Sequence, residues 1–268
     1  MFRVVLGLRS VLSLLCVALL FVVGSLVLRL GVLPAYWLRP HRRFHLVSRY
    51  MKWMSRWILR FLSLGGARFR RSGLLPTAEP VVVVANHQGL IDILQITLLA
   101  EPFVPAFVTR RRYQRFVPLV SESLRLLGAP VVDPGRDPHA ALEAIREGAR
   151  TLPHGIMIFP EGHRSRDGEI RPFRRSGLEA ILEARPAPVY LVVGDGLWKA
   201  GRLLEMLFAV HRIDAATEAF GPFEPPDDPA AVPAFITGLR ERMVERLRDM
   251  RSRRAVGGSP AGLPATDP

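Results

Sequence analysis

The strongest constraint on the fold is an apolar, mostly β-branched run that ends in the polar pair Asn86-His87. This run predicts a buried strand from Pro80 to Ala85. A second apolar run follows, and it predicts a helix near Leu90–Leu99. His87 is therefore expected in the turn at the carboxyl end of the strand, which is where open α/β sheets place their ligands.

Strand and helix patterns alternate from Pro80 onward, which predicts an α/β fold with a mostly parallel sheet flanked by helices. We assign this domain to residues 67–254, with residues 68–78 as a strand or connector that leads into the sheet. Further strands are expected at Phe103–Thr109, Pro130–Asp133, Gly155–Phe159 and Val189–Val193, with a weaker one near Phe208–Arg212. Further helices are expected at Phe116–Leu127, Pro138–Leu152, Ser176–Ala184, Leu197–Leu207 and Ala234–Arg254. Residues 255–268, rich in Gly, Pro and Ala, are expected to be disordered.

Residues 1–41 are predicted to form a membrane anchor and its connector. No charged residue occurs from Ser10 to Leu28, and at about 1.5 Å per residue such a helix nearly spans a hydrocarbon core of about 30 Å. A cleaved signal peptide is the alternative, but no small-x-small cleavage site closes the apolar run. Gly31 and Pro34 can form a turn, so the sequence leaves open whether the segment spans the bilayer or re-enters it.

The distribution of arginine predicts the orientation of the anchor. Arg3 and Arg9 precede the apolar run, whereas Arg29, Arg39, Arg42 and Arg43 follow it. Because cationic flanks stay preferentially on the cytoplasmic side, we expect a membrane protein whose catalytic domain is cytoplasmic. The only cysteine, Cys16, lies inside the apolar run, which excludes a disulfide framework and fits a reducing compartment.

Residues 42–66 are predicted to form a basic amphipathic helix at the membrane interface. Its cationic side chains recur three or four positions apart and therefore share one face: Arg49, Lys52, Arg56 and Arg60. Apolar side chains fall on the opposite face, with Trp53 and Trp57 between the two. Cations bordered by tryptophan suit the headgroups of an anionic bilayer. The alternative is an ordinary surface helix that packs on the domain.

The net charge of +13 indicates an anionic partner, and arginine carries nearly all of it because the only lysines are Lys52 and Lys199. Membrane lipids, phosphorylated substrates and nucleic acid all have the required charge. Nucleic-acid binding favours aromatic residues interleaved with a basic patch on a soluble domain, whereas Trp53 and Trp57 lie beside the apolar segment. We therefore expect anionic membrane lipids as partners and no nucleic acid.

His87 and Asp92 have a spacing that suits acid–base chemistry. Asp92 falls in the first turn of the helix that follows His87, so its carboxylate can return to hold one imidazole nitrogen. The other nitrogen is then free to take a proton. On its own, so short a pattern is also explained by a helix-capping Asn86 beside a surface histidine.

A second polar loop, residues 159–168, follows the strand expected at Gly155–Phe159. Its sequence is Phe-Pro-Glu-Gly-His-Arg-Ser-Arg-Asp-Gly, which combines carboxylates, two arginines, a serine and two glycines. Such a composition is poorly suited to a core and well suited to phosphate binding.

Together these stretches resemble the glycerophospholipid acyltransferase family, typified by lysophosphatidic acid acyltransferases. That family carries N-H-x4-D, a G-x-x-x-x-D-R-like loop, F-P-E-G-T-R-S and an apolar strand rich in Val and Pro. The matching stretches here are Asn86–Asp92, Gly128–Asp133, Phe159–Ser165 and Pro188–Val193, in the same order. The resemblance implies transfer of a fatty acyl group from acyl-CoA or acyl carrier protein to the hydroxyl of a lysophospholipid, with lysophosphatidic acid as the default acceptor.

The resemblance also implies roles for individual residues. Acyl transfer to an alcohol requires a base, which would be His87, and Asp92 would fix its tautomer and stabilise the imidazolium. The implied substrate-binding residues are Glu161, Gly162, Arg164 and Ser165, with Arg136 in place of the arginine that the pattern has directly after Asp133. Since the base can activate the acceptor hydroxyl itself, we expect no acyl-enzyme, no cofactor and no metal.

Four positions depart from the family pattern. Gly89 stands where serine is usual, Pro134 where arginine is expected, His163 where threonine is usual and Leu191 where proline is common. The changes leave His87, Asp92 and Glu161 intact, so the resemblance implies a retained activity with an open acceptor identity. His163 is either a second acid–base group or a simple loop substitution.

Two other classes of function remain as alternatives. A non-catalytic basic module that binds anionic membranes explains the charge and the amphipathic helix, but it leaves His87, Asp92 and Glu161 without a role. A metal-dependent hydrolase could use these residues together with His163, although no close-spaced ligand motif supports it.

Overall fold

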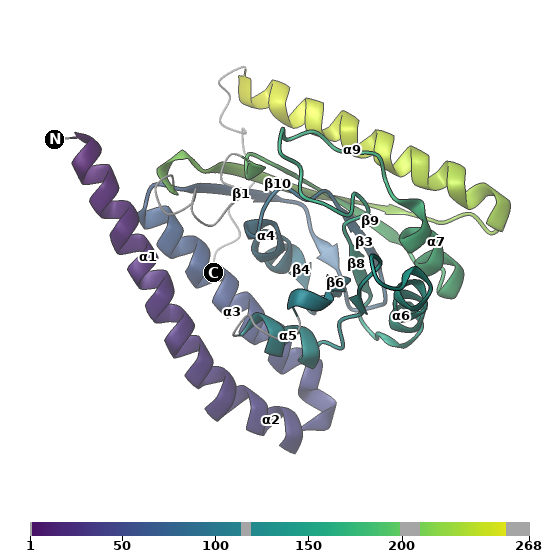
Figure 1. Cartoon of the computed structure of the whole chain (residues 1–268), viewed down its shortest axis with the longest axis horizontal. Helices are drawn as coiled ribbons and strands as arrows, with labels where there is room; N and C mark the ends of the chain where they lie inside the picture. The colour runs from purple at the N-terminus through teal and green to yellow at the C-terminus, as the bar shows by residue number, and fades with distance from the viewer. Residues whose placement is uncertain (1, 114–118, 199–209, 256–268) are drawn as a thin grey trace.

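The computed structural model describes residues 2–113, 119–198 and 210–255. In these ranges the chain forms the predicted α/β fold, with a six-stranded sheet in the order β1-β10-β9-β3-β8-β5 (Figure 1). The strands are β1 (Arg68–Ser72), β10 (Asp214–Phe223), β9 (Val189–Asp195), β3 (Val82–Ala85), β8 (Ile156–Ile158) and β5 (Ala106–Phe107). β10 and β9 are antiparallel and the other neighbouring strands are parallel, which confirms a mostly parallel sheet.

The strand predicted before His87 is β3, and it lies in the middle of the sheet between β8 and β9. All of its residues are buried, from Val82 to Ala85. A central strand in an α/β sheet has helices on both faces, so apolar side chains are favoured on both sides. This explains why its sequence is uniformly apolar rather than alternating.

Helices cover both faces of the sheet (Figure 1). α7 (Arg175–Ala184) and α9 (Val232–Ala255) lie on one face, with α6 (Pro138–Thr151) packed against α7. α4 (Ile91–Leu99) and α3 (Arg43–Leu64) lie on the other, and α5 (Val120–Leu126) contacts α3. α9 buries one stripe of side chains at helical spacing: Ile236, Leu239, Met243, Leu247 and Met250.

One predicted strand joins the main sheet only in part, and another does not join it. The stretch Phe103–Thr109 contributes β5, but β6 (Thr109–Arg110) leaves the sheet and pairs with β7 (Val131–Val132). The strand predicted at Pro130–Asp133 therefore belongs to a separate two-stranded ribbon. A second ribbon joins β2 (Leu75–Pro76) to β4 (Ala100–Glu101).

The strand predicted near Phe208–Arg212 is wrong. Val210–Arg212 forms a single 3-10 turn, and residues 208–209 lie outside the described residues. The strand in this region is β10, whose first half is rich in alanine and so has a weak β propensity. Residues 116–118 and 199–207 of two predicted helices, and 256–268 of the predicted disordered tail, also lie outside the described residues.

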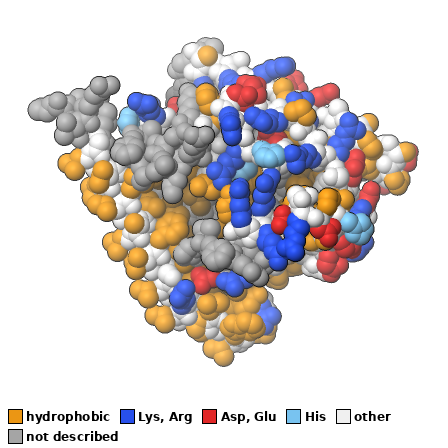
Figure 2. Space-filling model, viewed as in Figure 1, with side chains coloured by type: hydrophobic (Ala, Val, Ile, Leu, Met, Phe, Trp, Pro, Cys, Tyr) orange, Lys and Arg blue, Asp and Glu red, His pale blue; other side chains and the backbone are white. Residues whose placement is uncertain are grey.

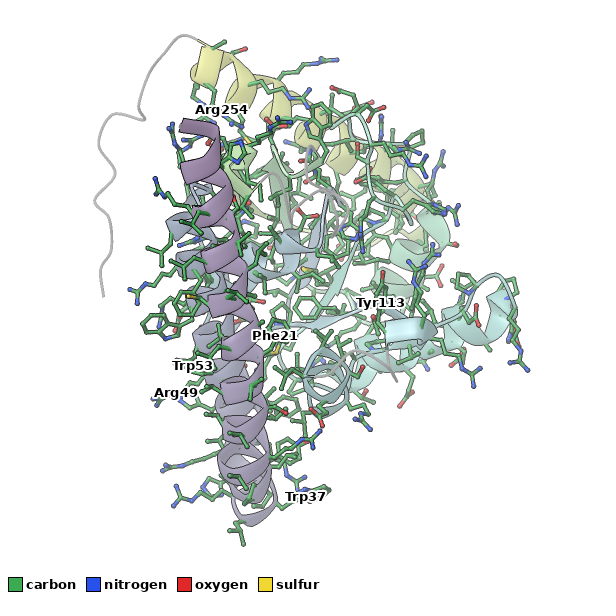
Figure 3. All side chains as sticks on the ribbon, turned by 60° about the vertical axis from the view of Figure 1, so that its left-hand side comes forward. Phe21, Trp37, Arg49, Trp53, Tyr113 and Arg254 are labelled. Atoms are coloured by element: carbon green, nitrogen blue, oxygen red, sulfur yellow. The ribbon has the colours of Figure 1, made fainter. Side chains whose placement is uncertain are left out.

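The N-terminal segment forms a helical hairpin with α3. α1 (Phe2–Val27) continues through a π-helical turn (Leu28–Val32) into α2 (Leu33–Leu38). The chain reverses at a 3-10 turn (Pro40–Arg42), and α3 then runs back along α1 (Figure 3). Gly31 and Pro34 lie inside the first arm, so the reversal occurs several residues later than these residues had suggested.

α1 packs along α3 through small residues and hydrogen bonds. Gly24 lies so close to Met54 that a Cβ at position 24 would be 2.6 Å from the methionine sulfur. The Tyr50 hydroxyl donates to the Gly24 carbonyl oxygen at 3.1 Å. The Ser13 hydroxyl donates to the Phe61 carbonyl oxygen at 2.7 Å. The apolar N-terminal helix is therefore an integral layer of the folded domain.

The apolar face of α3 is buried within the protein, against α1 and α4. Val47, Met54, Ile58 and Leu62 are the buried positions of this face. On the opposite face Arg49, Arg56 and Arg60 are exposed, whereas Lys52 donates to Glu101 at 2.7 Å. α3 therefore packs on the domain as an ordinary surface helix, which was the alternative to an interfacial helix. Its basic side is the side that is available to lipid headgroups.

α1 presents the outer apolar surface of the hairpin (Figure 2). Its exposed large apolar side chains are all aliphatic: Leu8, Val11, Leu12, Leu15, Leu19, Val22, Val23 and Leu26. At the turn end Trp37 and Leu38 are also exposed (Figure 3). By length and composition the helix Gly7–Leu38 is able to cross a membrane.

Two neighbouring leucines of α1 test whether this helix stays docked on the domain. Leu20 is 6% exposed and Leu19 is 63% exposed. We expect Leu20→Ala to lower the free energy of unfolding by about 2–5 kcal/mol because it leaves a cavity against α3. Leu19→Ala should change it by no more than about 0.5 kcal/mol. Chemical unfolding in detergent measures both, and equal small effects would show that α1 leaves the domain.

Candidate active site

The two polar stretches singled out in the sequence meet at one edge of the sheet. β3 and β8 are neighbours, and each polar stretch begins directly after one of them. After β3 ends, the side chain of Asn86 pairs with the backbone of β9. Its amide nitrogen donates to the Gly194 carbonyl oxygen (2.9 Å), and its amide oxygen accepts from the Gly194 N–H (2.7 Å). This pairing ties the turn after β3 to the end of β9.

His87 and Asp92 form the predicted pair. The imidazole Nδ1 lies 2.8 Å from Asp92 Oδ2, and the side chains are 18% and 4% exposed. The carboxylate is an obligatory acceptor, so the Nδ1 proton lies in this hydrogen bond and Nε2 keeps a free lone pair. The ring also stacks on Phe159 at a centroid distance of 4.3 Å. The imidazole is thereby held from one edge and one face.

Asp92 Oδ2 also organises the backbone of the turn. It accepts hydrogen bonds from the N–H groups of Gln88 (2.6 Å) and Gly89 (2.9 Å) in addition to the imidazole. Backbone donors to a buried carboxylate stabilise its ionised form. Three donors from the turn thus converge on one oxygen of the buried carboxylate directly behind His87.

Glu161 links the two polar stretches. Its Oε1 accepts from the His87 N–H at 2.9 Å and its Oε2 accepts from the Arg171 N–H at 3.0 Å. The side chain is 3% exposed, and burial raises the pKa of the carboxyl group while the two backbone N–H donors oppose the rise. Both carboxylate oxygens are thus occupied by the protein, so Glu161 shapes the site through the backbone of His87.

Ser165 and Gln88 complete the connection between the loops. The Ser165 N–H donates to the His87 carbonyl oxygen at 2.7 Å, and its hydroxyl lies between Asp167 (2.8 Å) and the Gly168 N–H (2.9 Å). The fully buried Gln88 donates to the Gly168 carbonyl oxygen at 3.1 Å. These bonds make Ser165 a part of the loop framework, and the substrate contact implied by the resemblance stays a prediction.

A basic hollow of about 370 Å³ lies beside the loop that follows β8. It is lined by Arg110, Arg111, Arg112, Val132, Asp133, Pro134, Gly135, His163 and Arg174. Arg110 donates to the Gly162 carbonyl oxygen at 2.6 Å, which fixes one guanidinium at the rim. The cationic side chains gather with histidine on one face of the molecule (Figure 2). Such a hollow can hold a phosphate group.

Gly162 allows the loop to pass close to this hollow. Its φ is +73°, a conformation that residues with a side chain rarely adopt, and a Cβ would lie 3.1 Å from Arg174. His163 follows at the rim, with Nδ1 3.5 Å from the Arg174 guanidinium. Burial and the cations Arg174, Arg110 and Arg171 lower the pKa of His163.

Arg164 and Arg136, both implied as substrate-binding residues, lie at different places. Arg164 donates to the Tyr113 hydroxyl at 3.1 Å and is half-buried beside the site. Arg136 lines a second hollow of about 380 Å³ that shares Arg111 and Asp133 with the first one. Arg136 therefore lies at the neighbouring hollow rather than at the one that His163 lines.

Several site residues were not predicted from the sequence. Arg110 and its neighbours were missed because they follow a two-residue strand, although a run of arginines directly after an expected strand is a usable signal. Phe159 was noted only as part of a motif, yet it supports the imidazole. In the described part of the chain, no group of three or more His, Cys, Asp or Glu side chains is arranged to hold a metal ion.

The fold and the paired motifs define a class of protein. Residues 66–193, just under half of the chain, match the family model described as Acyltransferase, and over this range the chain is similar to that family. Curated proteins that the chain is similar to are named 1-acyl-sn-glycerol-3-phosphate acyltransferases, in agreement with the resemblance of the motifs to lysophosphatidic acid acyltransferases.

Two such relatives illustrate the extent of the similarity. The enzyme of Chlamydomonas reinhardtii is 28% identical over 136 residues, which are 49% of this chain and 40% of that protein. The 1-acyl-sn-glycerol-3-phosphate acyltransferase alpha of Ovis aries is 26% identical over 215 residues, which are 78% and 72% of the two chains. The chain thus spans less than half the length of the Chlamydomonas relative.

A solved structure has the same fold over most of the chain. The crystal structure of the 1-acyl-sn-glycerophosphate acyltransferase PlsC from Thermotoga maritima aligns with a TM-score of 0.66 at 21% identity. The alignment covers 90% of this chain and 98% of that one. The shared fold therefore extends well beyond residues 66–193.

Glu161→Gln tests the role of the buried carboxylate. An amide presents only one oxygen, so either the His87 or the Arg171 N–H loses its acceptor, and we expect a loss of about 1–3 kcal/mol in the free energy of unfolding at pH 7. Burial raises the pKa of Glu161 in the folded state above its ordinary value of 4.5, which applies in the unfolded state. The titration of Glu161 should therefore lower the free energy of unfolding of the wild type as pH rises from 4.5 to the folded-state pKa.

Urea unfolding between pH 4 and pH 7 measures both effects, and the variant should lack the Glu161 part of the pH dependence. Glu143→Gln, at an exposed ion pair with Arg150, is the control and should change stability by about 0.5 kcal/mol or less. A stability of Glu161→Gln equal to that of the wild type at every pH would contradict a linking role for Glu161.

Proposed function

We propose that this protein is a membrane-anchored O-acyltransferase that moves a fatty acyl group from acyl-CoA or acyl carrier protein to the hydroxyl of a lysophospholipid, with lysophosphatidic acid as the first candidate. The observation that carries the proposal is the 2.8 Å hydrogen bond between His87 and Asp92 at the carboxyl end of β3. The family match supports the reaction class, and the basic hollow beside Gly162 supports an anionic acceptor.

His87 acts as the general base. Its Nε2 takes the proton of the acceptor hydroxyl while the hydroxyl oxygen attacks the thioester carbonyl carbon, and the Asp92 carboxylate stabilises the imidazolium through Nδ1. When the tetrahedral intermediate collapses, the carbon–sulfur bond breaks and the imidazolium returns the proton to the leaving thiolate. Both substrates are present together, and no acyl-enzyme forms. The only cysteine, Cys16, lies on α1.

The acceptor phosphate is held in the basic hollow. Arginine suits this role because its planar guanidinium donates two parallel hydrogen bonds to phosphate oxygens. Arg110 and Arg174 line the hollow, and Arg164 lies beside it, held by Tyr113. Gly162 brings its backbone close to the bound phosphate. The acceptor hydroxyl then faces His87, which is tied to the same loop through Glu161.

The apolar outer face of α1 anchors the protein in the bilayer. Its exposed leucines and valines match the acyl region, and the arginines of α3 match anionic headgroups. The excess of arginine after the apolar run favours a cytoplasmic position of the catalytic domain. This position gives access to both acyl-CoA and acyl carrier protein.

An acyl-transfer assay on membranes that contain the protein tests the proposal. Labelled acyl-CoA and acyl carrier protein are each offered with a panel of lysophospholipids. We expect product with the wild type, and we expect His87→Ala to lower turnover by roughly 10²–10⁴-fold because it removes the base. Asp92→Asn should lower it nearly as much, since the imidazole loses the charge that stabilises its protonated form.

His139→Ala is the matched control, because His139 is exposed on α6. Its turnover should equal that of the wild type. If folded, membrane-bound wild type gives no product from any donor and acceptor pair, the enzyme proposal fails and the non-catalytic lipid-binding alternative stands.

His163 predicts a pH dependence of acceptor binding. Burial and the nearby cations Arg174, Arg110 and Arg171 lower the pKa of this imidazole, whereas a bound phosphate would raise it, so acceptor binding should take up a proton. The KM for lysophosphatidic acid should therefore rise as pH increases from the free-state pKa to the bound-state pKa. The measurement is this KM in the wild type divided by the same KM in His163→Thr, and the quotient should rise from about pH 5.5 to pH 8. Dividing the two values removes the effect of the titration of the phosphate itself, which is the same for both proteins. A constant ratio would mean that His163 does not meet the phosphate.

A further inference from the structure

The two oxygens of Asp92 have very different surroundings. Oδ2 accepts hydrogen bonds from His87, Gln88 and Gly89. Oδ1 is buried and has no hydrogen-bond partner among the described residues. An unpaired oxygen on a buried carboxylate costs free energy, so a polar group that the protein can hold there is favoured.

Thr217 lies on the same side of the sheet as Asp92, and its side chain also lacks a hydrogen-bond partner in the part of the chain that the structure describes. It is 2% exposed, and its hydroxyl oxygen has no hydrogen-bond partner among the described residues. Thr217 is on β10, directly paired with Gly194 on β9. A hydroxyl is both donor and acceptor, so it can complement a carboxylate oxygen that only accepts.

Gly194 brings these two oxygens to a common space. A Cβ built on Gly194 would lie 3.8 Å from Thr217 Oγ1, 3.9 Å from Asp92 Oδ1 and 3.8 Å from Asn86 Oδ1. Three oxygens from three different segments thus surround the space above a residue without a side chain. A polar space of this kind, with two or more partners, is where proteins hold buried water.

We propose that one buried water molecule binds between Asp92 Oδ1, Thr217 Oγ1 and Asn86 Oδ1, and that Thr217 is a positioning residue for the His87–Asp92 pair. The water donates one hydrogen to Asp92 and one to Asn86, and it accepts the hydrogen of the Thr217 hydroxyl. Asn86 Oδ1 already accepts from the Gly194 N–H and has a second lone pair for this bond.

This arrangement fixes the carboxylate from both sides. Oδ2 is held by the turn that carries His87, and Oδ1 is held through the water by β10. The carboxylate plane then stays aligned with the imidazole during proton transfer. The kinetic consequence rests on the proposed acyltransferase function, whereas the water site itself does not.

The first test is a pair of substitutions at position 217. Thr217→Val keeps the shape of the side chain and removes the hydroxyl, and we expect kcat to fall about tenfold with an unchanged acceptor KM, the size of one hydrogen bond to a charged group. Thr217→Ser keeps the hydroxyl and should restore kcat. A merely structural role of Thr217 would give no rescue by serine and no separation of kcat from KM.

The second test is Gly194→Ala, which is sterically mild because the added methyl group lies at ordinary contact distance from all three oxygens. The methyl group takes up the space that the oxygens surround and therefore displaces the water. We expect the same roughly tenfold loss of kcat together with a lower thermal stability, because the displaced water leaves Asp92 Oδ1 and Thr217 Oγ1 without a partner. Wild-type kcat in this variant would overturn the proposal.

A high-resolution crystal structure of the full chain gives a readout independent of activity. The wild type should show ordered solvent within hydrogen-bond distance of Asp92 Oδ1 and Thr217 Oγ1, and Gly194→Ala should not. If the solvent is present and the wild type transfers no acyl group, only the proposed function fails. If the wild type is active and the solvent is absent, this inference fails.

Discussion

The geometry of the site depends on hydrogen bonds between the backbone of His87 and the loop that follows β8. Glu161 accepts from the His87 N–H, and the Ser165 N–H donates to the His87 carbonyl oxygen. Both bonds involve main-chain groups, so the position of the imidazole is determined by the fold of the second loop as well as by its own turn. The two sequence motifs therefore act as one structural unit, which explains why the pair is more informative than the His87–Asp92 spacing alone.

The N-terminal hairpin is coupled to the same unit from the other side. Leu20 of α1 belongs to a buried cluster that includes Ile91, the residue before Asp92, and several residues of α3. The apolar segment thus has two surfaces with different roles: its inner side completes the hydrophobic core under α4, and its outer side is free for a bilayer. A sequence of nearly uniform hydropathy cannot distinguish these sides, because leucine satisfies both environments.

The sequence predicted the sheet, its central strand and the His87–Asp92 pair, because these follow from uninterrupted apolar runs and from residue spacing. It did not predict β10, whose alanines are buried by their neighbours rather than by strong β propensity. It also did not reveal that Ser165 is bonded within its own loop or that both oxygens of Glu161 accept from backbone N–H groups. Hydrogen-bond partners in loops depend on the relative position of two strand ends, and that position is a property of the whole sheet.

The basic hollow contains arginine where lysine would supply the same charge. In such surroundings neighbouring cations lower the pKa of a lysine, and a neutral amine is a strong nucleophile toward an activated acyl group. In the proposed acyl transfer, a lysine there would compete with the acceptor hydroxyl and become acylated itself. A guanidinium stays protonated and does not react in this way. In the proposed reaction, the arginine lining of the hollow therefore offers the acyl donor no reactive amine.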